Sequence, residues 1–291
     1  MPPARFDPWR RAVRVWQRHW CCVPSALLLV LSLALPAQAN LEAFARNCSS
    51  ATLPPEKAVR FCTKALQTQR LGPKGTAQTL LNRGRSLKAT GQSEAALADF
   101  EAALRSYPNL GAAWTDRGLI LSDQGRHEEA VASFDNALLV DPEDWRALVG
   151  RGAARTAVGQ HDAALSDLDQ AVEAEPERAF GYLIRARAHA AAGRKLDAMR
   201  DFDEATRLSP NDPAPLLGRA ALREADAPNA ALRDYTAALE LSPDLAFAHY
   251  RRGRVFDGLG HTALANRDLR RAWRLGYRDV WLHNRMVSLG D

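Results

Sequence analysis

The sequence predicts an all-α fold in which helix-turn-helix units stack into a solenoid. Three residue types recur at intervals of 34 or 33 residues and keep a common register. The recurring prolines are Pro108, Pro142, Pro176, Pro210 and Pro243. The recurring glycines are Gly91, Gly125, Gly159, Gly193 and Gly260, and the last two are 67 residues apart because one unit lacks the glycine. The recurring alanines are Ala96, Ala130, Ala164, Ala198, Ala231 and Ala265. Recurrence at a fixed period of this length is typical of an array of one supersecondary unit.

The unit from 111 to 144 contains two amphipathic helices. Apolar and small residues spaced by four and three share one face of a helix. These stripes are Trp114, Gly118 and Leu121 in the first helix and Ala130, Phe134 and Ala137 in the second. Gly125 separates the helices, because glycine readily adopts the left-handed conformation in which many helices end. Pro142 closes the unit, since proline cannot continue a helix.

This order of aromatic, small, bulky, alanine, aromatic and proline residues resembles the tetratricopeptide repeat (TPR) family. The resemblance covers six units, at 77–110, 111–144, 145–178, 179–212, 213–245 and 246–279. It implies a right-handed superhelical solenoid. It also implies a scaffold that binds a protein or peptide partner through its concave helical surface.

Three segments depart from the regular repeat. We expect 70–76 to be a loop, because it is rich in Gly and Pro. The turn of the fifth unit, at 224–229, lacks the usual glycine, and Pro228 is expected to begin the helix that follows. We expect 280–291 to form a C-terminal capping helix, which a solenoid needs at its end.

Residues 1–39 have the pattern of a secretory signal peptide. Five arginines precede an apolar run of 11 residues at 25–35, and Ala37-Gln38-Ala39 is a typical cleavage pattern. Eleven residues are too few to span about 30 Å of hydrocarbon as a helix. We therefore expect export across the inner membrane to a bacterial periplasm, with no integral membrane helix in the mature chain. An uncleaved anchor is the alternative.

The charge of the mature chain gives no indication of a nucleic-acid partner. The whole sequence has 39 Lys and Arg against 34 Asp and Glu. Five of the basic residues and one acidic residue lie in the leader, which leaves 34 against 33. A net charge near +1 lacks the basic excess expected of a nucleic-acid binder.

Residues 40–76 are predicted to form an N-terminal capping half-repeat with a disulfide. The segment 56–68 copies the stripe of a second helix, with Ala58, Cys62 and Ala65 at the three core positions. Cys48 and Cys62 are the two cysteines left after leader removal, and an oxidising compartment allows them to pair. Two buried, unreacted thiols are the alternative.

An arginine precedes the small residue of every first helix, a position that is usually apolar in the TPR family. These residues are Arg83, Arg117, Arg151, Arg185, Arg219 and Arg252. Aspartates lie level with them on the second helices, at Asp99, Asp167, Asp201, Asp234 and Asp268. We predict an Arg-Asp ladder within or between units, with Arg117 as an internal control because Ser133 faces it. A solvated charged face is the alternative.

Catalytic and cofactor motifs are not evident. The sequence has no HExxH metal motif, no phosphate-binding glycine loop and no GxSxG nucleophile motif. The repeats leave little room for a catalytic domain. We therefore expect a protein that is not an enzyme, with no cofactor and no metal.

Family positions that face the concave side suggest a partner-binding surface. The candidates are Arg85, Leu119, Arg146, Phe180, Leu183, Arg187, Phe247, Tyr250 and Arg254. Apolar residues interspersed with arginines suit an extended or helical peptide that carries carboxylates. Packing between neighbouring units is the alternative role of the apolar residues. The alternative functions are a structural or assembly component of the cell envelope, or a membrane-tethered adaptor with an uncleaved leader. The sequence does not indicate the partner's identity or the oligomeric state.

Overall fold

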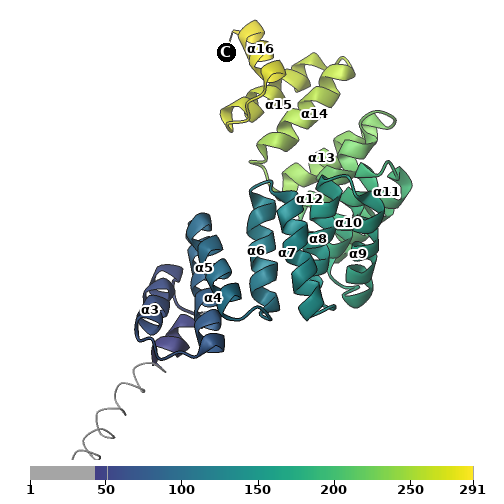
Figure 1. The fold of residues 1–291 in the computed structure, drawn as a ribbon. Coiled ribbons are helices and arrows are strands. Elements are labelled where there is room, and N and C mark those ends of the chain that lie inside the picture. Colours follow the sequence, from purple (N-terminus) through teal and green to yellow (C-terminus); the bar gives the residue numbers. More distant parts are fainter. Residues whose placement is uncertain (1–42, 51, 291) are drawn as a thin grey trace, which may run out of the picture. The chain divides into compact units, whose positions relative to one another are not determined.

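The computed structural model describes residues 43–50 and 52–290, which form helices and turns with no strand among them (Figure 1). The chain divides into two compact units, 1–102 and 103–291, and the division falls within one helix, α5 (Ser93–Ser106). The expected signal peptide lies outside the described residues. Within the described part of the chain, no helix combines the length and the apolar character needed to cross a bilayer.

Unit 1 contains a helix at 43–48, then α3 (Pro55–Gln67), α4 (Pro73–Ala89) and the start of α5. The expectation of a loop throughout 70–76 is wrong in its second half, because α4 begins at Pro73. Proline suits the first turn of a helix, where its missing N–H would lack a partner in any case. The N–H of Thr76 already donates to the Gly72 carbonyl over 2.8 Å, which closes the first helical turn.

A disulfide joins Cys48 to Cys62, as the sequence predicted, and links the helix at 43–48 to α3. Cys62 lies on the buried stripe of α3 with Ala58 and Ala65, at the place that an aromatic ring takes in several later units. The disulfide therefore lies in the core of this short capping unit.

Unit 2 continues as a series of antiparallel helix pairs (Figure 1). The first helices are α6 (Gly111–Asp123), α8 (Trp145–Ala157), α10 (Ala179–Ala191), α12 (Pro213–Arg223) and α14 (Ala246–Gly258). The second helices are α7 (His127–Val140), α9 (His161–Ala174), α11 (Lys195–Leu208), α13 (Pro228–Leu241) and α15 (Thr262–Arg274). Each second helix of α7 to α13 packs against both the first helix of its own pair and the first helix of the next. This is the predicted solenoid of helix pairs.

Glycine ends the first helix at the regular turns. Gly125 has a φ of 76°, and Gly91, Gly159, Gly193 and Gly260 are also left-handed. The N–H of Arg126 reaches back to the Leu121 carbonyl over 2.9 Å. Such a bond satisfies a carbonyl that the end of the helix would otherwise leave without a partner.

The turn of the fifth repeat, at 224–229, differs from the other turns, as predicted. α12 has 11 residues and α13 begins at Pro228 without an intervening left-handed glycine. Glu224 in this turn accepts hydrogen bonds from the Tyr235 hydroxyl and from Arg251. These side-chain bonds tie the turn to α13 and α14.

Aromatic rings on the second helices pack onto glycines of the first helices. A Cβ on Gly118 would lie 2.7 Å from the Phe134 ring, and one on Gly150 would lie 2.5 Å from it. Both distances are shorter than real contacts allow, so Phe134 fits between α6 and α8 only because both positions are glycine. The predicted role of Gly118 in close helix packing is confirmed.

The Arg-Asp ladder is confirmed. In five repeats the Nε and Nη2 atoms of the arginine donate to the two carboxylate oxygens of the aspartate that faces it on the second helix. These pairs are Arg83 with Asp99, Arg151 with Asp167, Arg185 with Asp201, Arg219 with Asp234 and Arg252 with Asp268. The aspartates are buried and the arginines are mostly covered. Hydrogen bonds to Asp201 raise the pKa of Arg185, which stays charged.

The Nη1 atom of each of these arginines also donates a hydrogen bond to the second helix of the preceding repeat. The acceptors are Thr63 for Arg83, Asp135 for Arg151, Asp169 for Arg185, Asp203 for Arg219 and Thr236 for Arg252. Each guanidinium therefore connects three helices, namely its own helix and the second helices of two successive repeats. Arg117 behaves as the predicted control, because its Nη1 donates over 2.6 Å to the Ser133 hydroxyl.

The C-terminal helix α16 (Val280–Leu289) covers the last pair, as the sequence predicted. Leu282 and Met286 are buried against Leu269 and Ala272 of α15. The Asp279 carboxylate accepts the Leu282 N–H over 2.7 Å, which caps the N-terminus of α16.

Candidate peptide-binding groove

The first helices of three successive repeats, α6, α8 and α10, line a cavity of about 360 Å³. α8 contacts both α6 and α10, so their exposed edges form one continuous surface. The lining residues are Leu119, Ser122 and Asp123 of α6, Trp145, Arg146, Val149, Gly150 and Ala153 of α8, and Phe180 and Ile184 of α10. We call this site the α6–α8–α10 groove.

Helical spacing brings the α8 residues to one side. Val149 and Gly150 follow Arg146 by three and four residues, and Ala153 follows them by four and three, which places all of these positions on one face. Gly150 adds no side chain to the groove. The Phe134 ring lies against this position and leaves no room for a Cβ. The glycine that permits close packing thus also leaves space for a ligand.

Two aromatic residues form one wall of the groove. The Trp145 and Phe180 ring centroids are 6.2 Å apart. Trp145 is held in place, because its indole N–H donates to the Ala171 carbonyl over 3.0 Å and the Arg178 guanidinium lies 4.3 Å from its ring centroid. Phe180 is 51% exposed, which is unusual for a large apolar side chain beside a cavity. The wall therefore offers a fixed ring and an exposed ring.

Arg146 brings a fixed positive charge to the groove. Its Nη2 donates to Asp116 over 2.9 Å, while half of the arginine side chain stays exposed. Asp116 is buried, so the ion pair anchors the arginine at one end. Asp144 accepts the Arg146 N–H over 3.0 Å and fixes the start of α8. A carboxylate of a ligand could approach the exposed side of this guanidinium.

Ser122 adds a polar group beside the apolar residues. Its hydroxyl oxygen is buried and has no hydrogen-bond partner among the residues that the structure describes. Buried polar groups are nearly always satisfied in folded proteins.

The structure brings three predicted site residues together here, namely Leu119, Arg146 and Phe180. Arg187 is exposed and follows Ile184 by three residues on α10, so it extends the same helix face. Leu183 is 4% exposed and packs in a core cluster with Phe202. It therefore offers almost no surface to a partner.

Two predicted residues on α14, Tyr250 and Arg254, lie in a separate aromatic cluster with the C-terminal segment. The Tyr250 ring stacks on Tyr277 at 4.5 Å, and its hydroxyl donates to Asp279 over 2.6 Å. The Arg254 guanidinium lies 4.3 Å from the Trp281 ring centroid. Tyr250 is only 6% exposed, so it offers little surface to a partner.

The other two predicted residues are Phe247 and Arg85. Phe247 remains 44% exposed beside the aromatic cluster. Arg85 is an exposed residue of α4 in unit 1. A partner-binding role for each of them stays a prediction.

Sequence reasoning from family positions missed Trp145, Ser122 and Ile184. The exposed aromatic wall could have been suspected from Trp145 and Phe180, which stand near the starts of successive first helices. Ser122 and Ile184 carry no such signal, because only the packing of three helices places them at one cavity. Within the described ranges, no group of three or more His, Cys, Asp or Glu side chains is placed to hold a metal ion.

Repeating helix pairs with a groove between their first helices define a helical repeat protein. A family model described as tetratricopeptide repeat matches residues 81–135, 115–157 and 154–213. Residues 81–213 therefore belong to the tetratricopeptide repeat family. Its fold is that of a scaffold that mediates protein interactions.

Solved structures with the same fold are numerous. A tetratricopeptide repeat protein from Parabacteroides merdae aligns with a TM-score of 0.66 at 21% identity, covering 79% of this chain and 90% of that one. A thermophilic TPR protein of Thermus thermophilus aligns with a TM-score of 0.54 at 24% identity, over 62% of this chain and 98% of that one. YrrB, a TPR protein with an unusual peptide-binding site, aligns with a TM-score of 0.50 at 21% identity, over 64% and 95%. No curated protein matches the chain in sequence.

Proposed function

We propose that this protein is an exported scaffold that binds an extended peptide segment of a partner protein in the α6–α8–α10 groove. The groove itself carries the proposal, because it combines apolar residues, an exposed aromatic ring and a guanidinium in one cavity. Its volume of about 360 Å³ is within the range of ligand pockets, which runs from roughly 300 to 1,000 Å³. Such a volume suits a few side chains of a peptide.

The lining indicates the chemistry of the peptide. An apolar or aromatic side chain would pack against Phe180 and Val149. A carboxylate one or two residues away would meet Arg146 or Arg187. We therefore expect a segment in which an acidic residue stands close to a large apolar residue. A protein of the same fold, YrrB, carries a peptide-binding site, which is consistent with this use of the scaffold.

Export is supported by two features of the N-terminal region. The leader pattern at 1–39 is typical of a secretory signal. The Cys48–Cys62 disulfide is of the kind that persists in oxidising compartments such as the periplasm. N-terminal sequencing of the protein recovered from the envelope fraction should begin near residue 40. A chain that retains its leader would instead support a membrane-tethered adaptor.

A peptide-display selection tests the groove directly. Peptides selected on the wild-type protein are measured again on Phe180→Ala and Arg187→Glu variants by fluorescence anisotropy. We expect Phe180→Ala to weaken binding by about fivefold or more, because removal of a central aromatic contact typically costs about 1 kcal/mol or more. Arg187→Glu should weaken binding most for peptides rich in acidic residues.

Phe247→Ala is the matched control, since Phe247 is also a half-exposed phenylalanine near the start of a first helix but lies outside the groove. Arg254→Glu is unsuitable as a probe, because Arg254 contacts Trp281 and Tyr250 and its loss would disturb the C-terminal cluster. Equal binding to wild type and Phe180→Ala, or an equal loss in Phe247→Ala, would contradict peptide binding in the groove.

A further inference from the structure

The near-zero net charge of the mature chain conceals a strong segregation of charge between the two units. The described residues of unit 1 contain nine Lys or Arg residues and four acidic residues, Glu56, Glu94, Asp99 and Glu101. Three of these acids lie on α5, so Glu56 is the one acidic residue within the described part of 43–92. The described residues of unit 2, 103–290, contain 25 basic and 27 acidic residues. The N-terminal part of unit 1 is therefore a concentrated positive surface in an otherwise balanced molecule.

The basic residues of unit 1 also differ in type. Four of the five lysines in the whole sequence are in this segment, at Lys57, Lys64, Lys74 and Lys88. Elsewhere the chain uses arginine almost exclusively, and the ladder shows why, since a planar guanidinium binds a carboxylate through two bonds. Lysine is a compact, hydrated charge on a flexible stem that needs no fixed partner geometry. The change of residue type indicates a diffuse electrostatic role.

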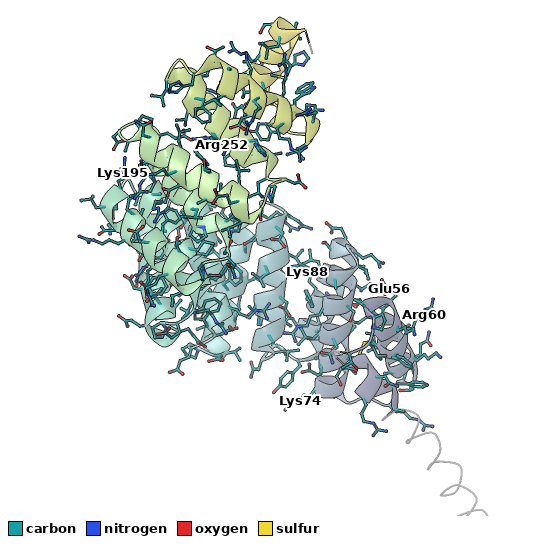
Figure 2. The ribbon with its side chains drawn as sticks, turned by 180° about the vertical axis from the view of Figure 1, so that it is seen from behind. Glu56, Arg60, Lys74, Lys88, Lys195 and Arg252 are labelled. Carbon is teal, nitrogen blue, oxygen red and sulfur yellow. A yellow bond between two sulfur atoms is a disulfide. The ribbon has the colours of Figure 1, made fainter. Side chains whose placement is uncertain are left out.

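Three of these cations lie in a row on the outside of α3. Lys57, Arg60 and Lys64 are spaced by three and four residues, and all are exposed. Within the described residues, neither Lys57, Arg60 nor Lys74 forms an ion pair. Figure 2 shows Arg60 on α3 and Lys74 on α4 with their side chains on the outside of the unit. Charges that are left without partners are available to an external anion.

Aromatic side chains lie among these charges. The rings of Phe44 and Phe61 are 6.4 Å apart, and the Lys64 Nζ lies 5.7 Å from the Phe44 ring centroid. Both phenylalanines are partly exposed. A hollow of about 650 Å³ along α3 is lined by residues that include Lys57, Arg60, Phe61 and Lys64. The face thus combines basic and apolar groups.

We propose that this face of unit 1, formed by Phe44, Lys57, Arg60, Phe61 and Lys64, binds the surface of an anionic phospholipid bilayer. Lysines attract the negatively charged headgroup layer, and phenylalanine rings on an interfacial helix pack at the boundary between the headgroups and the acyl chains. The charges follow one side of α3 and do not converge on a single point, which fits an extended surface better than a peptide terminus. A second copy of this chain is a poor occupant, because the second helix of its last repeat, α15, carries four arginines and one aspartate.

Vesicle binding provides the test. Wild-type protein is compared with the triple variant Lys57→Gln, Arg60→Gln, Lys64→Gln by co-sedimentation with vesicles of phosphatidylglycerol and phosphatidylcholine. Each basic residue near an anionic surface contributes about fivefold in affinity, so the triple variant should bind about 100-fold more weakly. Wild-type binding should weaken as salt rises from about 0.1 M, because ions screen exposed charges.

The control is Arg233→Gln, Arg267→Gln, Arg274→Gln, which removes the same net charge from exposed positions of unit 2. All chains are used in the same form, so a retained leader would contribute equally. Vesicle binding that the control keeps and the α3 variant loses supports the proposal. Equal losses in both variants, equal binding to pure phosphatidylcholine, or binding to polyglutamate without binding to vesicles would overturn it. The peptide-display assay uses unit 2 residues, so its failure would be distinguishable from failure here.

Discussion

Removal of one ladder carboxylate should destabilise the repeat array by an amount set by its two charged hydrogen bonds. Asp201 accepts bonds of 2.8 Å from both Nε and Nη2 of Arg185, and its side chain is 9% exposed. A hydrogen bond to a charged group contributes about 1.5 to 3 kcal/mol. Asp169 would still accept the Nη1 bond, so Arg185 would not lose every partner. Loss of both bonds should therefore lower the free energy of unfolding of Asp201→Ala by about 3 kcal/mol or more.

Ser133→Ala is the matched comparison, because Ser133 holds the same ladder position in another repeat. It accepts one bond of 2.6 Å from Arg117 and carries no charge. Its removal should cost about 0.5 to 1.5 kcal/mol, the range for an ordinary hydrogen bond. The converse change, Ser133→Asp, should stabilise the protein by offering Arg117 the two-oxygen acceptor that its counterparts have.

Urea denaturation followed by circular dichroism gives the free energies, and hydrogen exchange of the α10 and α11 amides shows where the loss occurs. A double-mutant cycle with Arg185→Leu isolates the pair, and we expect a coupling energy of about 1 kcal/mol or more. An Asp201→Ala variant that is no less stable than Ser133→Ala would refute the reasoning. It would mean that desolvation of the two charges cancels their attraction.

Three further predictions concern individual contacts. Replacing Cys48 and Cys62 by alanine should lower the stability of unit 1 by about 3 kcal/mol, the entropic value for a loop of about 15 residues, as measured by thermal unfolding with and without reductant. Burial and a hydrogen bond to a carboxylate raise the pKa of Tyr235, so stability is complete below the unfolded tyrosine pKa of about 10 and falls at higher pH. At pH of about 11 the wild type should lose about 1.4 kcal/mol more than Tyr235→Phe in urea titrations, and equal losses would contradict this. Gly118→Ala should cost about 1 to 3 kcal/mol, since the added Cβ would lie 2.7 Å from Phe134; an unchanged denaturation midpoint would show that the ring can move.

The sequence by itself determined the repeat. Each turn glycine and closing proline acts through its own backbone conformation, so the helix boundaries follow from local rules. The pairing of Arg151 with Asp167 was also predictable, because two positions equally distant from a turn lie level in an antiparallel hairpin. The prediction of a loop at 70–76 is wrong for 73–76, because a proline in the first turn is compatible with a helix.

Only the tertiary structure decided which residues face outward and which contacts cross between units. The Nη1 bond from Arg151 to Asp135 depends on how one pair stacks on the next, which no local rule specifies. The family pattern predicts partner contacts at the same positions of every first helix. Tyr250, however, is covered by the aromatic residues around Tyr277, and Leu183 is buried in a core cluster. Burial depends on neighbours that are distant in the sequence, so the groove at Phe180 became visible only when α6, α8 and α10 were packed together.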